Sequence, residues 1–263
     1  MRRLLLLTLV VGCDPVYPFS SGRENEIVFG ISQSAEGVSA DYELIGLGGH
    51  GGSTAAAFRD GDGEGSCWLE SLDDRLGKPR VDPGVATWSG GTLGSPPGTG
   101  LLVQANQPEP TKQAAAGWTS SDAITFYAEG FAMPALDRVT MTAPLVELTI
   151  GTITPDASNG MKLTPASDVG VTWTPPAEPT SSRVLVTLET EHVNVRCFNR
   201  ADTGSAIVPA KSIAQLFPAD GSPITGKLMI ASHRQTTLLA PGSWVVYVVA
   251  TSVHRDIAFT GTR

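Results

Sequence analysis

The chain has 263 residues, of which 17% are charged, and its 26 acidic residues outnumber its 18 basic residues, which gives a formal net charge of −8. A protein that binds nucleic acid through phosphate contacts carries a basic patch or stripe. No cluster of lysine and arginine follows Arg2 and Arg3 in this sequence, which argues against nucleic acid as a partner.

The chain begins MRRLLLLTLVVGC, which combines two basic residues, an apolar run and the small Gly12 before Cys13. This pattern predicts a secretory signal peptide over residues 1–12. The apolar run has about half of the roughly 20 residues that a membrane-spanning helix needs, and no later run approaches that length. The sequence therefore predicts export, with no transmembrane helix in the mature chain.

The segment VVGC, which ends at Cys13, resembles the bacterial lipobox, where a cysteine is acylated and becomes the first residue of a mature lipoprotein. Val10 stands where leucine is commonest in that motif. The resemblance implies a lipid anchor on Cys13, a membrane as partner and a location in the cell envelope, on the inner or the outer membrane. Residues 13–25 would then be the lipidated cysteine and a flexible tether. The alternative is ordinary signal-peptide cleavage, with Cys13 incidental.

From residue 26 onward, short apolar runs alternate with turns rich in glycine and proline, which is typical of β-sandwiches and β-barrels. The runs of the first half are EIVFGIS, DYELIGL, GVATWS, GLLVQA and AITFYAEG. We predict an all-β fold with two β-sandwich domains, residues 26–150 and 151–263, each long enough to bury a core. The stretch VTMTAPLVELTIGTI, residues 139–153, is expected to cross the junction between them.

Gly46, Gly48 and Gly51 satisfy the pattern G-x-G-x-x-G of dinucleotide-binding loops. In a Rossmann unit such a loop leads into a helix and then a second parallel strand. Here DGDGEGSC follows Arg59 and would end any helix after about two turns. No alternation of strands with long helices comes after it. We therefore interpret these glycines as a turn or hairpin that uses positive φ angles, and expect no nucleotide cofactor.

The segment HGG at His50 is similar to the oxyanion loop of some esterases, which also need a nucleophile elbow G-x-S-x-G. The sequence has no such elbow, and its other histidines, His192, His233 and His254, are scattered. A Ser-His-Asp triad assembled only in space stays open. An envelope-tethered hydrolase is therefore the alternative function.

The turn DGDGEG places Asp60, Asp62 and Glu64 at alternate positions, and so resembles the first half of an EF-hand-like calcium loop. The twelfth position of that pattern is Ser71, where a glutamate is needed, and Glu70 comes one residue early. We interpret the turn as a solvated acidic hairpin tip and expect weak or absent calcium binding.

The second half contains the clearest strands. VGVTW, RVLVTLE and VNVRCF alternate with period two, which places one set of apolar side chains on a single face: Val169, Val171 and Trp173; Val184, Val186 and Leu188; Val193, Val195 and Cys197. The run SWVVYVVA from Ser243 is continuously apolar, as in a strand covered on both faces. One short helix is expected over Pro209–Phe217, where a proline stands near the start.

The runs DVGVTWTPP, SRVLVTLE and SWVVYVVATS together resemble the strand pattern of fibronectin type III and immunoglobulin-like sandwiches. The whole chain also looks like the all-β lipoproteins of Gram-negative envelopes, a likeness that implies no activity. The function expected is therefore a lipid-anchored binding or structural module, with an envelope protein or a glycan as its partner.

Lipidation of Cys13 would leave Cys67 and Cys197 as the remaining thiols. Export places them in a compartment where disulfides form and persist, which favours a bond between them. Two separately buried free thiols, one in each half, are the alternative, because a bond requires the two Cα atoms to lie within roughly 7 Å.

Overall fold

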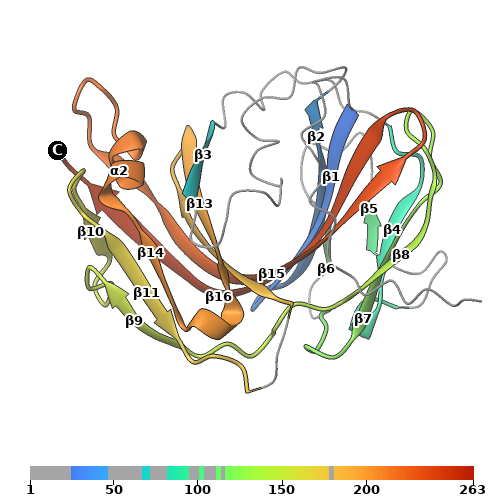
Figure 1. The fold of residues 1–263 in the computed structure, drawn as a ribbon, viewed down its shortest axis with the longest axis horizontal. Helices are drawn as coiled ribbons and strands as arrows, with labels where there is room; N and C mark the ends of the chain where they lie inside the picture. The colour runs from blue at the N-terminus through green and yellow to red at the C-terminus, as the bar shows by residue number, and fades with distance from the viewer. Residues whose placement is uncertain are drawn as a thin grey trace, which may run out of the picture.

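Three β-sheets make up the described part of the chain in the computed structural model, which describes residues 25–46, 67–71, 82–94, 101–103, 111–113, 116–177 and 181–263 (Figure 1). The large sheet has nine strands in the order β3-β13-β12-β15-β16-β1-β2-β6, with β10 also paired to β16. In that order their bounds are Cys67–Ser71, Val193–Arg200, Arg183–Glu189, Ile224–Ala240, Trp244–Gly261, Asn25–Ser34, Gly37–Gly46 and Thr111–Gln113, and β10 is Met161–Leu163.

Two smaller sheets lie against the outer side of the curved large sheet (Figure 1). The four-stranded sheet has the order β5-β4-β7-β8, and the three-stranded sheet has the order β14-β11-β9. Their strands are, in that order, Leu101–Val103, Ala86–Ser89, Ala123–Ala128 and Leu136–Thr142, followed by Ser205–Val208, Val169–Trp173 and Ile150–Thr154. The fold is all-β, as the sequence predicts.

The helical segments of the described residues are short. They are η2 (Gly91–Leu93), η3 (Ala201–Thr203), α2 (Ala210–Ile213) and η4 (Ala214–Leu216). The last two form the helix expected over Pro209–Phe217, and Pro209 is its N-cap residue. Proline suits this place because the first N–H groups of a helix have no partner inside the helix.

The hairpin of β15 and β16 forms the centre of the large sheet, with strands of 17 and 18 residues. Along its first half β16 pairs in parallel with β1, and at its end it pairs in parallel with β10. The run from Trp244 to Ala250 is buried at every position, which confirms a strand covered on both faces. The large sheet takes strands from both sides of residue 151, so the two halves of the chain share it.

Two hydrophobic cores lie along this sheet. The first lies between the large and the four-stranded sheet and holds a cluster of aromatic rings. The centroid of the Phe126 ring lies 4.5 Å from that of Phe29 and 4.8 Å from that of Trp88. Such pairs add stabilisation beyond their area of contact. The second core gathers Val169, Val171, Trp173, Val184, Val186, Leu188, Val195 and Cys197 with the start of β15. The prediction that these side chains share one face of their strand is thereby confirmed, and β12 is buried on its other face as well.

The connection from β8 to β9 passes from one core to the other. Ala143 and Val146 pack in the first core, whereas Leu145 and Leu148 pack in the second. Residues 139–153 thus contribute strands to two different sheets. The cores are joined by this connection and by the β15–β16 hairpin.

Gly226 shows how tightly β15 and β16 pack at the second core. A Cβ atom at this position would lie 2.5 Å from Cζ of Phe259, and closer still to the Glu189 carbonyl oxygen. We expect Gly226→Ala to lower the free energy of unfolding by about 1–3 kcal/mol, because the added methyl group must displace backbone. Urea unfolding measures this change.

Gly170→Ala is the matched control for this substitution. Gly170 also lies within a strand, but a Cβ atom there would meet Thr154 Cβ at 3.8 Å, an ordinary contact. We expect this variant to be as stable as the wild type or slightly more so, because alanine restricts the unfolded chain. Equal losses in both variants would contradict the packing argument.

Candidate functional site

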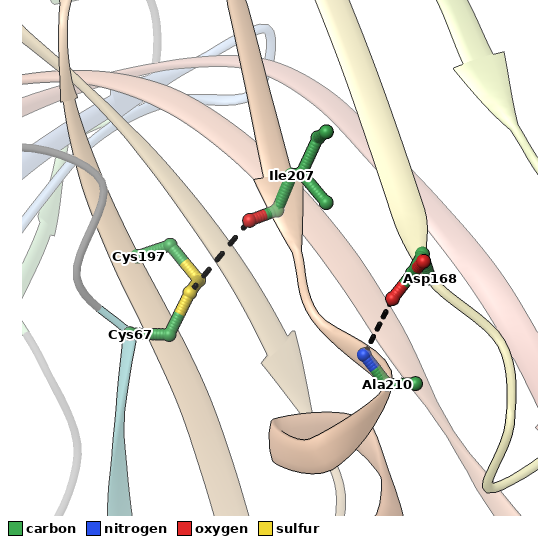
Figure 2. The surroundings of a disulfide bond; sticks show 5 residues. All are labelled: Cys67, Asp168, Cys197, Ile207 and Ala210. Carbon is green, nitrogen blue, oxygen red and sulfur yellow. Dashed lines mark hydrogen bonds between the residues drawn. A yellow bond between two sulfur atoms is a disulfide. The ribbon is translucent and has the colours of Figure 1, made fainter.

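The predicted disulfide between Cys67 and Cys197 is present in the structure (Figure 2). The two cysteines face each other across β3 and β13, with their Cα atoms 4.1 Å apart. Cys197 is buried, and Cys67 Sγ lies 4.0 Å from the carbonyl oxygen of Ile207 on β14. The bond therefore joins residues separated by 130 positions and holds a short edge strand from the first half against the second half.

Figure 2 also shows how α2 begins. The amide N of Ala210 donates a hydrogen bond of 2.6 Å to Oδ1 of Asp168, which precedes β11. This contact supplies a partner to one of the N–H groups that a helix start leaves unpaired. It has a structural role and does not form a ligand site.

Several residues singled out by the sequence lie outside the described residues: Cys13, Gly48, His50, Gly51, Asp60, Asp62 and Glu64. Gly46 is described and is the last residue of β2, which pairs antiparallel with both β1 and β6. A Rossmann loop follows a strand of a parallel sheet. Gly46 instead ends an antiparallel strand, and the turn predicted to follow it lies outside the described residues.

Ser232 and His254 are brought together where the two cores meet. The β15–β16 ladder shifts register after Ile230, and His254 is left without a cross-strand partner at this bulge. Bulges redirect side chains, and here Nε2 of His254 contacts Oγ of Ser232. The same hydroxyl hydrogen-bonds the carbonyl oxygen of Leu145, in the connection between the cores.

The direction of these hydrogen bonds decides what the Ser232–His254 pair can do. A carbonyl oxygen only accepts, so the single hydroxyl proton of Ser232 goes to Leu145. Nε2–H of His254 must then donate to Ser232, which is the reverse of a nucleophile giving its proton to a histidine base. Ser232 is also 0% exposed. The pair holds the connection to the hairpin and has no nucleophile to offer a substrate.

A second polar cluster lies on the face of the large sheet opposite the second core. His233 is in register with Arg183 of β12, and its ring centroid lies 4.7 Å from that of Phe198 on β13. The pKa of His233 is lowered to about 3, mainly by burial and in smaller part by the charges of Arg183 and Arg196. Its imidazole is therefore neutral near pH 7.

This face concentrates positive charge on a partly buried surface. Arginine pairs suit carboxylates and phosphates because each guanidinium can donate two parallel hydrogen bonds. Arg183 and Arg196 already engage in further interactions of their own, and Arg200 pairs with Asp202. The cluster therefore contributes first to the structure of the sheet.

Within the described ranges, no group of three or more histidine, cysteine, aspartate or glutamate side chains is placed to hold a metal ion. No helix in the same ranges combines the length and the apolar character that crossing a bilayer requires.

Comparison of the chain with protein families, with curated proteins and with solved structures finds no match in any of the three.

Sequence reasoning did not find the Ser232–His254 contact or the surroundings of His233. The alternation in β15 indicates which face each residue occupies, but the Ser232–His254 contact depends on a bulge in the ladder with β16. The adjacent residues Ser232 and His233 point to opposite faces. Their partners come from strands far apart in the chain.

Proposed function

We propose that this chain is an exported, lipid-anchored protein of the cell envelope that acts as a binding or structural module. The observation that carries the proposal is the Cys67–Cys197 disulfide, taken together with the signal-peptide pattern that ends at Cys13. Disulfides persist in oxidising compartments and are rare in the cytosol. The bond and the N-terminal pattern thus support the same location by independent arguments.

Two β-sandwiches, of the kind found in fibronectin type III and immunoglobulin-like domains, are the architecture that we propose for this module. Two separate hydrophobic cores support this, each formed between the large sheet and one smaller sheet. The sandwiches would share the β15–β16 hairpin. Because the shared hairpin would fix the two sandwiches to each other, we infer a rigid module whose surface binds an envelope protein or a glycan.

A binding role is favoured over the hydrolase alternative by the state of the histidines. His254 donates to a buried serine, and His233 packs against Phe198. Neither arrangement provides the exposed nucleophile and the accepting imidazole that acyl transfer requires.

The lipid anchor is tested by Cys13→Ser in the full-length protein. We expect the variant to lose incorporation of labelled palmitate and to move from the membrane fraction to the soluble fraction, because two or more acyl chains are what hold such a protein stably on a bilayer. Val10→Leu serves as the control and should be acylated as well as the wild type. Retention of Cys13→Ser in the membrane fraction would contradict the proposal.

A further inference from the structure

Three large apolar side chains are exposed at one end of the large sheet. Phe131 is 81% exposed, Leu239 60% and Val85 45%, and we call these three residues the apolar tip. The other large exposed apolar residue among the described positions is Ile207, 64% exposed, which lies on β14 beside the second core. Scattered single residues of this kind are ordinary, whereas a group at one end calls for a partner.

Two contacts fix the position of Phe131 relative to β1. Before β7 begins, Trp118 N donates a 2.7 Å hydrogen bond to Oε1 of Gln33, near the end of β1. Further along, the Phe126 ring meets Phe29 in the middle of β1. The chain therefore runs toward the start of β1 as it leaves β7 and reaches Phe131.

The start of β1 lies beside the β15–β16 turn, at the upper right in Figure 1. Asn25 N donates a 2.9 Å hydrogen bond to the Ser243 carbonyl oxygen in that turn. Leu239 is in register with Val245, next to the same turn, and its side chain lies on the face of the large sheet away from the first core, because Leu238 and Ala240 pack into that core. Asn25 and the apolar tip thus lie at the same end of the large sheet, with Phe131 and Val85 in loops of the four-stranded sheet and Leu239 on the opposite face of the large sheet.

The loop that carries Phe131 is held in place by backbone hydrogen bonds. Glu129 N donates to the Val85 carbonyl oxygen at 2.8 Å, and Ala132 N donates to that of Asp82 at 2.9 Å. Gly130 has φ +77°, and a Cβ atom there would lie 2.7 Å from Ala135 Cα. Phe131 is thus presented outward by an ordered loop, which lowers the entropy lost when it binds.

We propose that the apolar tip inserts into the surface of the bilayer that anchors Cys13, an inference that rests on the proposed function. Asn25 follows Cys13 by twelve residues. A chain of that length spans at most roughly 40 Å, so the anchor keeps this end of the large sheet close to the lipid. Phenylalanine and leucine are side chains that interfacial segments bury below the headgroups.

The charges around the apolar tip indicate which bilayer it suits. Among the described residues around Phe131, the carboxylates of Asp82, Glu129 and Asp137 are exposed, against the guanidinium of Arg138. Anionic lipids would repel this surface. Burial of apolar side chains, and not attraction between charges, therefore drives the insertion. We expect it to be deeper in phosphatidylcholine vesicles than in vesicles that also contain phosphatidylglycerol.

Spin labels test the insertion in the acylated, full-length protein bound to phosphatidylcholine vesicles. A nitroxide is attached to Phe131→Cys, Leu239→Cys or Ile207→Cys, and its collisions with oxygen and with a water-soluble nickel chelate are compared. We expect the oxygen-to-nickel ratio to be several-fold higher at positions 131 and 239 than at 207. Ile207 is the matched control because it is as exposed as Leu239 but lies beside the second core.

The outcomes separate this inference from the proposed function. Failure of the wild type to float with vesicles would overturn the lipid anchor itself. Flotation with equal ratios at all three positions would leave the anchor standing and overturn the insertion. Low access of both reagents at position 131, with dipolar coupling between labels, would show a second copy of the chain on the apolar tip and would also overturn it.

Discussion

Removal of the Cys67–Cys197 bond is expected to lower the free energy of unfolding by about 4 to 5 kcal/mol. The bond closes a loop of 130 residues in the unfolded chain. In the chain-entropy model, a loop of that length gives a contribution of this size. The variant Cys67→Ala/Cys197→Ala removes the bond without placing a hydroxyl group in the second core, and denaturant unfolding measures the loss.

The disulfide variant also has a local signature. β3 has five residues, pairs with β13 at the edge of the large sheet, and carries the bond at its first residue. Amide hydrogen exchange in Cys67–Ser71 should accelerate more than exchange in β12, which lies inside the sheet. Reduced wild-type protein serves as the control and should match the variant. A loss below about 1 kcal/mol, or protection unchanged in β3, would contradict the role assigned to the bond.

Acid is expected to destabilise the protein well above the range in which its carboxylates titrate. Burial lowers the pKa of His233 to about 3 and that of His254 to about 4, from an ordinary value of 6.5. The unfolded chain therefore binds protons first as the pH falls. The stability that the two neutral histidines contribute is fully present above pH 6.5. It is lost progressively as the pH falls toward their pKa values in the folded state.

The loss between about pH 7 and about pH 5 should reach roughly 2 kcal/mol for His233, and less for the half-buried His254. Unfolding in urea at a series of pH values measures it. His233→Gln and His254→Gln should each flatten the dependence, whatever they do to stability at neutral pH. His192→Gln replaces an exposed histidine and serves as the control. Equal pH dependence in all three variants would contradict the assignment.

Three aspartate carboxylates contribute to the pH dependence of stability at lower pH. Hydrogen bonds from Ser158 lower the pKa of Asp156, the guanidinium of Arg200 lowers that of Asp202, and Ser222 lowers that of Asp220. These groups lose their contribution only as the pH falls below their ordinary value of 3.8. Measurements of stability above that pH therefore exclude the contribution of these three carboxylates.

The sequence by itself determined the class of the fold and many of its elements. Period-two alternation located β11, β12 and β13 and identified the apolar side chains that pack in the second core, because residues two apart in a strand lie on the same face. Continuous apolar residues identified the strand that is covered on both faces, Trp244–Ala250. Export and the count of cysteines favoured the disulfide that the structure contains.

Only the tertiary structure decided which strands lie side by side. β1 pairs with β16, more than two hundred residues later, and the long hairpin joins both cores. The contact of Ser232 with His254 and the neutral state of His233 follow from this pairing. Alternation reports the face that a side chain occupies, but every strand offers the same backbone hydrogen bonds to its neighbours. The choice of neighbour is therefore set by the packing of the whole sheet.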